Sequence, residues 1–127
     1  MSYDKSIHAT LAQINMAIDQ LREWNLGISC ADDYLISPEG MKTLAATSML
    51  LEAVGEGIKK IDRRTGGKLL QLQPHIPWKD VMGMRDHIAH GYFDIDADII
   101  FDVVSNALDN LQDAINFLVQ VIQERQN

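Results

Sequence analysis

The residues best suited to chemistry lie close together between Lys79 and Asp94, in the segment KDVMGMRDHIAHGYFD. Arg85 keeps its positive charge at physiological pH and offers a planar fork that matches phosphate oxygens. Histidine has an unperturbed pKa near neutrality, so His90 can both take and give a proton near pH 7. Tyr92 follows two positions later. An arginine and a histidine are the minimum set of groups for phosphodiester transesterification without a metal.

The spacing of these residues limits how they could cooperate on one helix. Asp86 and His90 are four apart and share a helical face, so the carboxylate can orient or charge the imidazole. Arg85 and His90 are five apart, which places them about 140° apart around a continuous helix. To meet at one phosphate, either the helix unwinds near Gly91, the arginine swings round, or two protomers bring their helices together. We favour a symmetric dimer, which places two copies of each group about one axis.

Two other interpretations of this segment stay open from spacing alone. An arginine, a carboxylate and a histidine near a helix end often form only a solvated charge cluster. A metal site could instead use His87 and His90, three apart, with Asp86 or Asp94. The chain has no further cluster of histidine or cysteine that could complete this ligand set. We therefore expect no metal and no other cofactor.

Length and composition limit the class of protein that carries this segment. The chain has 127 residues, 46% of them apolar, which fits a single domain, residues 1–127, with a core of its own. Its one cysteine, Cys30, excludes an internal disulfide framework. No apolar run approaches the roughly 18 residues that a membrane span needs, and the N-terminus lacks a signal-peptide layout. We expect a cytoplasmic protein with no membrane partner.

Charge is distributed unevenly along the chain. The sequence has 11 basic and 18 acidic residues, a net charge of −7, which disfavours wrapping of nucleic acid by charge alone. Five basic residues within ten positions reverse this acidity locally: Lys59, Lys60, Arg63, Arg64 and Lys68. This basic cluster could steer a polyanion such as RNA or dock an acidic partner. A plain solvated helix end is the more frequent explanation for such charges.

Apolar residues that recur at steps of three and four predict the helices of the first half of the chain. The first helix follows the N-cap Asp4 and extends to Trp24. The second starts at Ser37-Pro38, a cap residue followed by a ring that suits the first helical position, and extends to about Arg64. Its expected apolar stripe includes Met41 and Met49, which we assign to the core.

The same periodicity predicts two more helices in the second half. One opens at Pro77-Trp78 and should stop at Gly91. The last follows three aspartates that favour its dipole, Asp94, Asp96 and Asp98, and extends nearly to the C-terminus. No segment alternates as a strand would over a useful length. The chain therefore predicts an all-α fold, an antiparallel bundle of four to five helices.

Three short runs make the chemistry-bearing segment specific: Pro74-His75-Ile76-Pro77-Trp78, Gly83-Met84-Arg85-Asp86 and His90-Gly91-Tyr92. With Val54-Gly55-Glu56 on the second helix, they resemble the HepT-like branch of the HEPN family. They reproduce its Pro-Trp approach, its Arg-x-x-x-x-His-x-Tyr signature and its Gly-Glu step. The chain departs from the pattern at Asp86, where family members often carry Asn.

The resemblance implies an all-helical homodimer that acts as a metal-independent ribonuclease, with its active groups at the dimer interface. Arg85 and His90 match the catalytic pair, and Asp86 matches the supporting polar position. Tyr92 matches the tyrosine that a partner nucleotidyltransferase antitoxin of the MNT type modifies with AMP. The chain would then be the toxin of a toxin–antitoxin pair. The alternative on the same fold is a catalytically silent HEPN module that binds nucleotide or holds a complex together.

Overall fold

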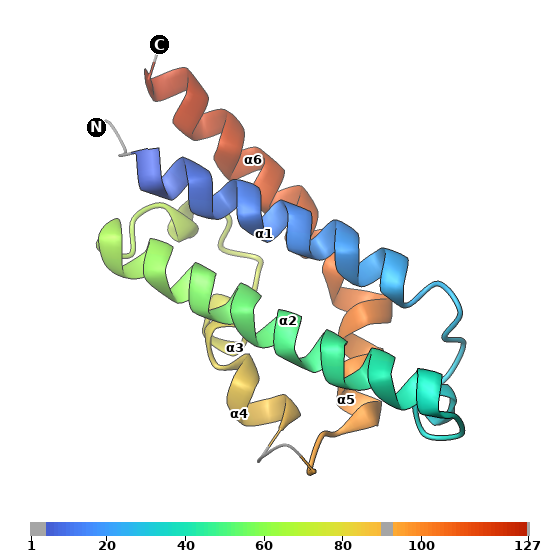
Figure 1. Ribbon diagram of the computed structural model, residues 1–127. Helices are drawn as coiled ribbons and strands as arrows, with labels where there is room; N and C mark the ends of the chain where they lie inside the picture. Colours follow the sequence, from blue (N-terminus) through green and yellow to red (C-terminus); the bar gives the residue numbers. More distant parts are fainter. Residues whose placement is uncertain (1–4, 90–92, 127) are drawn as a thin grey trace.

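The computed structural model describes residues 5–89 and 93–126, and this part of the chain is a bundle of helices (Figure 1). The long helices are α1 (Lys5–Trp24), α2 (Pro38–Arg64) and α6 (Leu108–Gln126). The short helices are α3 (Trp78–Met82), α4 (Met84–Ile88) and α5 (Ala97–Asp102). Two 3-10 turns, η1 (Ala31–Tyr34) and η2 (Leu70–Leu72), and one π-helical turn, η3 (Val103–Ala107), complete the elements. The predicted all-α class is confirmed.

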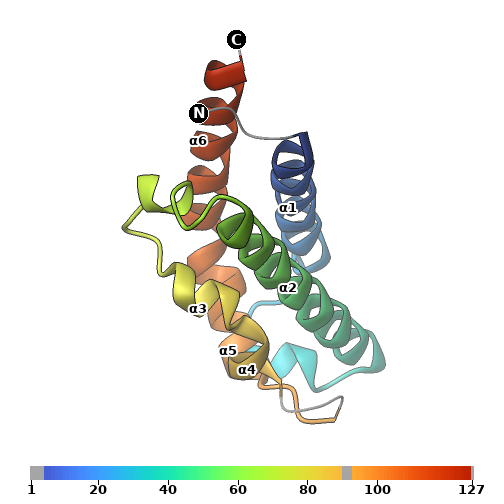
Figure 2. The same cartoon turned by 90° about the vertical axis from the view of Figure 1, so that its left-hand side faces the viewer.

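Helix α1 packs against both α2 and α6, and α3 and α4 pack against α2 on the side away from α1 (Figures 1 and 2). The predicted periodicity explains this arrangement, because the apolar stripe of α1 is buried: Ile7, Leu11, Ile14, Ile18 and Leu21. These side chains join one core cluster with buried residues of α2 and α6, among them Leu51, Ile58, Ile115 and Leu118. Burial of these stripes stabilises helices that would be marginal in isolation.

Helix α2 begins and ends where the sequence predicts. Ser37 is the N-cap, and its Oγ accepts a hydrogen bond of 2.9 Å from the backbone N–H of Gly40. Pro38 occupies the first helical position. The chain leaves the helix after Thr65 through Gly66 and Gly67, whose φ angles of 60° and 76° favour glycine.

A buried hydrogen-bond network fixes the turn η1 against α1 and α2. The hydroxyl of Tyr34, which has no exposed surface, donates a bond of 2.6 Å to Oδ1 of Asn25. The Asn25 amide donates in turn to the Leu21 carbonyl at 2.8 Å and to the Thr47 hydroxyl at 3.0 Å. Burial raises the pKa of Tyr34 to about 12. This network holds together the end of the bundle at which α2 begins.

The third predicted helix is interrupted, so the expectation of one continuous helix to Gly91 is wrong. It divides at Gly83 into α3 and α4, and α4 ends at Ile88. Ala89 is extended, with φ −155° and ψ 138°, and it pairs with Ile95 as an isolated antiparallel bridge. The backbone N–H of Asp96 donates to the Ile88 carbonyl at 2.9 Å and closes this corner. The 140° angle expected from a continuous helix therefore does not apply.

The last predicted helix is present but contains a π-helical turn. Asp96 caps its start, and its Oδ1 accepts a hydrogen bond of 3.1 Å from the Ile99 N–H. The turn η3 separates α5 from α6 without ending the helical path. Such insertions shift the phase of the apolar stripe, because one turn contains an extra residue. None of the helices in the described ranges is long and apolar enough to cross a membrane.

Two methionines that we assigned to the core are on the surface. Met41 is 57% exposed and Met49 is 69% exposed, although the neighbouring Leu44 and Leu51 are buried. Both methionines fit the periodicity of α2, but they lie at the edge of its buried stripe. The prediction was wrong for these two residues because periodicity alone does not define how wide the covered face is.

Candidate active site

Helix α4 carries Arg85 and Asp86, the two residues of the predicted catalytic set that the structure describes. Its inner side chains anchor it, since Met84 is only 7% exposed and Ile88 is fully buried. Arg85, Asp86 and His87 between them are exposed. One short helix therefore holds three polar side chains at the surface by burying the two apolar residues at its ends.

The position of α4 depends on how α3 packs against α2. Trp78 at the start of α3 is buried, and its indole N–H donates to the Gln73 carbonyl at 2.9 Å. At the other end of α3, the backbone of Val81 and Met82 lies directly against Gly55 of α2. Trp78 thus anchors the start of α3, and Gly55 of the Gly-Glu step receives its end. Together they fix the direction in which Arg85 projects.

Arg85 lines a groove that lies between α2, α4 and the bridge formed by Ala89 and Ile95. This Arg85 groove has a volume of about 560 Å³. Its described lining residues are Lys42, Ala45, Ala46, Ser48, Met49, Glu52, Arg85, Ala89 and Ile95. The alanines of α2 are small enough to leave a trough beside Arg85, with Lys42 and Glu52 at its ends. The groove therefore combines an apolar floor with two cations and one carboxylate.

The site cations are available to an external ligand. Among the residues that the structure describes, neither Arg85 nor Lys42 has a side-chain hydrogen bond or an ion pair. An unpaired guanidinium at the edge of a groove can form bidentate hydrogen bonds to phosphate.

A second groove lies on the other side of α4 and has the opposite character. It has a volume of about 590 Å³, and its described lining includes the carboxylates of Asp80 and Asp102 with His75 and His87. No lysine or arginine is among its described lining residues. Arg85 and His87 face different grooves because two positions correspond to about 200° on a helix. A phosphate ester therefore fits the Arg85 groove better, although the second groove is slightly larger.

Two residues of the predicted site, His90 and Tyr92, lie outside the described residues, as does Gly91 between them. The structure describes their flanks: Ala89 lines the Arg85 groove, and Phe93 is 98% exposed. Asp86 is exposed and has no side-chain hydrogen bond or ion pair within the described ranges. The prediction that Asp86 and His90 share one helical face requires a helix that continues to His90, whereas α4 ends at Ile88.

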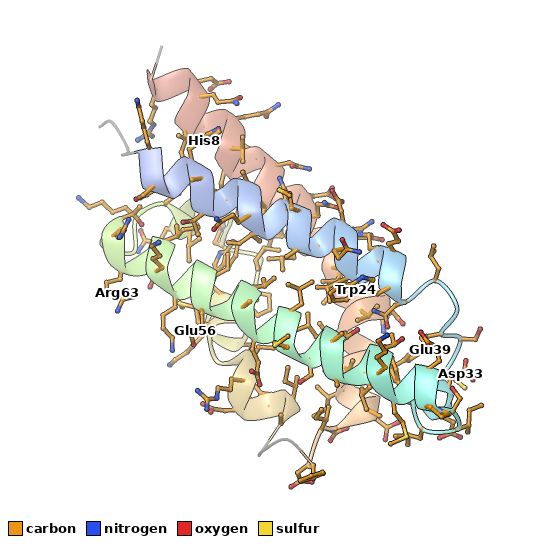
Figure 3. The ribbon with its side chains drawn as sticks, in the orientation of Figure 1. His8, Trp24, Asp33, Glu39, Glu56 and Arg63 are labelled. Carbon is orange, nitrogen blue, oxygen red and sulfur yellow. The ribbon has the colours of Figure 1, made fainter. Side chains whose placement is uncertain are left out.

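The basic cluster is at the far end of α2, away from the Arg85 groove. Arg63 marks this end in Figure 3, whereas Asp33 and Glu39 mark the end at which α2 begins. Lys59 pairs with Glu56 at 3.6 Å, and the Arg64 guanidinium donates to the Ser6 hydroxyl of α1. None of its five residues, Lys59, Lys60, Arg63, Arg64 and Lys68, lines the Arg85 groove. The cluster can thus act on a polyanion only at a distance from Arg85.

Lys42 and Glu52 line the groove, and nothing in the sequence singles them out. Both lie on the same face of α2 as Met49, at seven- and three-residue steps from it, which is a helical spacing. The sequence pattern places Met49 in the buried stripe of α2 and so does not indicate that this face is open to solvent. The structure shows that Met49 is exposed. Within the described ranges, no group of three or more His, Cys, Asp or Glu residues could hold a metal ion.

The fold and this groove define a helical-bundle protein with an arginine free to bind a phosphate-bearing ligand. The sequence model of the family described as "Ribonuclease HepT-like" matches residues 14–118. This chain belongs to that family, within the HEPN ribonucleases.

Curated relatives agree with this assignment. The chain is 31% identical over 102 residues to "Probable ribonuclease HepT" of Thermococcus cleftensis, covering 80% of this chain and 86% of the relative. It is 35% identical over 69 residues to "Putative RNase MJ0127" of Methanocaldococcus jannaschii, covering 54% of each chain. No solved structure matches the chain significantly.

Proposed function

We propose that the chain is a metal-independent endoribonuclease whose catalytic groups are Arg85 and His90, supported by Asp86. The observation that carries this proposal is the placement of Arg85, which is exposed and unpaired within the described ranges at the edge of a groove. Family membership supports RNA as the substrate. Ala89, the residue before His90 in the chain, lines the same groove.

In the proposed reaction, His90 takes the proton from a ribose 2′-hydroxyl, and the resulting oxygen attacks the adjacent phosphorus. The bond between phosphorus and the 5′-oxygen of the next nucleotide breaks. A histidine of either protomer returns a proton to that leaving oxygen. Arg85 stabilises the negative charge that grows on the phosphorane. The products are a 2′,3′-cyclic phosphate and a free 5′-hydroxyl, with no oxidant, reductant or water consumed.

The proposal includes a homodimer in which two copies of the site face one cleft. Met49 supports it, because a large apolar side chain that is 69% exposed lies in the lining of the Arg85 groove. Exposed apolar surface beside functional residues is typical of interaction sites. A two-fold axis near α4 would bring two Arg85 side chains and two histidines to the same substrate.

The proposal also assigns the chain to a toxin–antitoxin pair. An MNT-type nucleotidyltransferase would neutralise it by transferring AMP to Tyr92. The resemblance of the His90-Gly91-Tyr92 run to the family signature supports Tyr92 as the modified residue. Added AMP would bring a negative phosphodiester beside Arg85 and compete with RNA for the guanidinium.

A product-end assay on purified protein tests the central proposal. Wild-type protein with single-stranded RNA in EDTA should generate 2′,3′-cyclic phosphate ends, and Arg85→Ala should not. RNA that stays intact, while the protein binds nucleotide, would favour the catalytically silent HEPN module. Cleavage that requires an added divalent ion would contradict the metal-independent mechanism.

A further inference from the structure

Two charged side chains of the Arg85 groove have no role in the mechanism described above. Lys42 is exposed and Glu52 is half-buried, and both belong to α2. Neither side chain has a hydrogen bond or ion pair within the described ranges. An ionised carboxylate without a protein donor keeps its acceptor sites open to a ligand or to water. These two groups are therefore free to bind a ligand in the groove.

We propose that Lys42 and Glu52 make the Arg85 groove a nucleotide subsite. Lys42 binds a phosphate next to the scissile one, and Glu52 accepts a hydrogen bond from the amino group of a base. This inference rests on the proposed ribonuclease function and adds to it the residues that hold and select the RNA. It also gives the protein a preference for cytosine over uracil at the bound position.

The two charged side chains lie at opposite ends of the part of α2 that lines the groove. Lys42 and Glu52 are ten residues apart on α2, which corresponds to about 15 Å along the helix axis. Ala45 and Ala46 lie between them and keep the floor of the groove low and apolar. The charged ends thus bracket an apolar surface on which a base can lie.

Charge makes Lys42 important for binding. The chain carries a net charge of −7, so RNA is repelled at long range except where cations dominate locally. Lys42 and Arg85 are the two cations in the described lining of the groove, against the single carboxylate of Glu52. Arg85 is committed to the scissile phosphate, which leaves Lys42 to hold the neighbouring one.

The carboxylate of Glu52 discriminates between the two pyrimidines. Cytosine presents an amino donor at position 4 of its ring, where uracil presents a carbonyl acceptor. An ionised carboxylate only accepts hydrogen bonds, so it attracts the first group and repels the second. A glutamine of the same shape could instead satisfy either base.

Binding of a single-stranded DNA oligonucleotide tests the role of Lys42, because DNA lacks the 2′-hydroxyl and is not cleaved. Fluorescence anisotropy over a range of salt concentrations gives the affinity and its salt dependence. Lys42→Ala should reduce the slope of log affinity against log salt by about 0.7, the value for one phosphate contact on a single strand. With RNA, Lys42→Ala should raise KM about fivefold and change kcat less than twofold. Lys42→Arg should restore both.

Lys79→Ala is the matched control, since Lys79 is an exposed lysine of α3 that does not line the Arg85 groove. It should keep the wild-type slope. An unchanged slope in Lys42→Ala, or an equal loss in Lys79→Ala, would overturn the role of Lys42. If the wild type fails to cleave RNA, the ribonuclease proposal itself is wrong. If the wild type cleaves while Lys42→Ala matches it, only the subsite is wrong.

Two oligonucleotides that differ only in cytidine or uridine at the cleaved nucleotide test Glu52. The wild type should cleave the cytidine substrate about tenfold more efficiently, and Glu52→Gln should reduce this ratio to nearly one. A wild type without preference would contradict base selection by Glu52. An equal loss of kcat/KM on both substrates in Glu52→Gln would show instead that Glu52 positions Arg85.

Discussion

A Cβ atom on Gly55 would lie 2.7 Å from the carbonyl oxygen of Val81, closer than real Cβ atoms approach a backbone oxygen. Gly55 is buried in α2, and Val81 lies near the end of α3, one turn before Arg85. Only glycine at this position lets α3 settle against α2. The Gly-Glu step of the sequence is therefore a packing requirement of α3, the helix that directly precedes the one carrying Arg85.

Replacing Gly55 by alanine should separate α2 from α3 and shift Arg85. We expect the free energy of unfolding to fall by about 1–3 kcal/mol, the usual cost of overpacking a tight contact. Urea unfolding measures this change, and RNA cleavage should fall with it. Gly27→Ala is the matched control, because no described atom lies within 4 Å of a Cβ at Gly27. If the two variants have equal free energies of unfolding, α3 accommodates the added methyl group without loss of stability.

Arg85→Ala and His90→Ala should each reduce kcat by about 10²-fold or more, as expected for groups that act on the transition state. Arg85 is exposed, so its loss should leave the thermal unfolding temperature almost unchanged. His8→Ala on α1 serves as a control histidine distant from the Arg85 groove. Wild-type cleavage by His90→Ala would exclude His90 as the base.

Light scattering should report about twice the 14.3 kDa mass of one chain, because the proposed cleft needs two protomers. Met49→Asp should shift the protein toward the monomer by placing a charge in the proposed interface. Met16→Asp is the matched control on α1, since Met16 is 70% exposed and Met49 is 69% exposed. A wild-type monomer at micromolar concentration would contradict the dimer. A dimer unaffected by Met49→Asp would place its interface elsewhere.

Tyr92→Phe should escape silencing by the proposed nucleotidyltransferase partner and ATP, because it keeps the ring and removes the oxygen that would accept AMP. Intact-mass measurement after incubation should show added AMP on the wild type and none on the variant. Equal labelling of both proteins would assign the modification to another residue. The ribonuclease activity of the unmodified variant, measured in parallel, separates loss of silencing from loss of function.

Stability should fall at high pH because of Tyr34. Its pKa is raised to about 12 in the folded protein by burial, above the ordinary value of 10.0. The folded state therefore holds this proton more tightly than the unfolded state. The stabilisation of the folded state that results from this raised pKa is complete below pH 10 and is lost as the pH rises toward 12. Urea unfolding at about pH 8 and about pH 11 should show the decrease.

Tyr34→Phe is the variant that isolates this effect. It should flatten the decrease between those two pH values, because phenylalanine does not titrate. It should also lower stability near neutral pH by about 1–3 kcal/mol, since Oδ1 of Asn25 is left buried without its donor. An alkaline decrease as steep in Tyr34→Phe as in the wild type would assign the effect to other groups.

The sequence by itself determined the helices whose signals are local. Ser37 and Pro38 start α2 because a capping hydroxyl and a fixed φ act within one turn of the chain. Asp96 starts α5 for the same reason. Apolar periodicity likewise predicted the buried face of α1, because the apolar residues of an amphipathic helix form one stripe and that stripe packs against the core.

Only the tertiary structure decided where the chemistry-bearing residues lie. Lys42 and Arg85 are 43 positions apart, and they line one groove because Gly55 allows α3 to approach α2. The end of α4 at Ile88 depends on a bridge between Ala89 and Ile95, a pairing that no local propensity encodes. Met49 is exposed because no described neighbour covers that edge of α2. Propensity acts over a few residues, whereas a groove is defined by contacts between distant segments, and these exist only once the chain has folded.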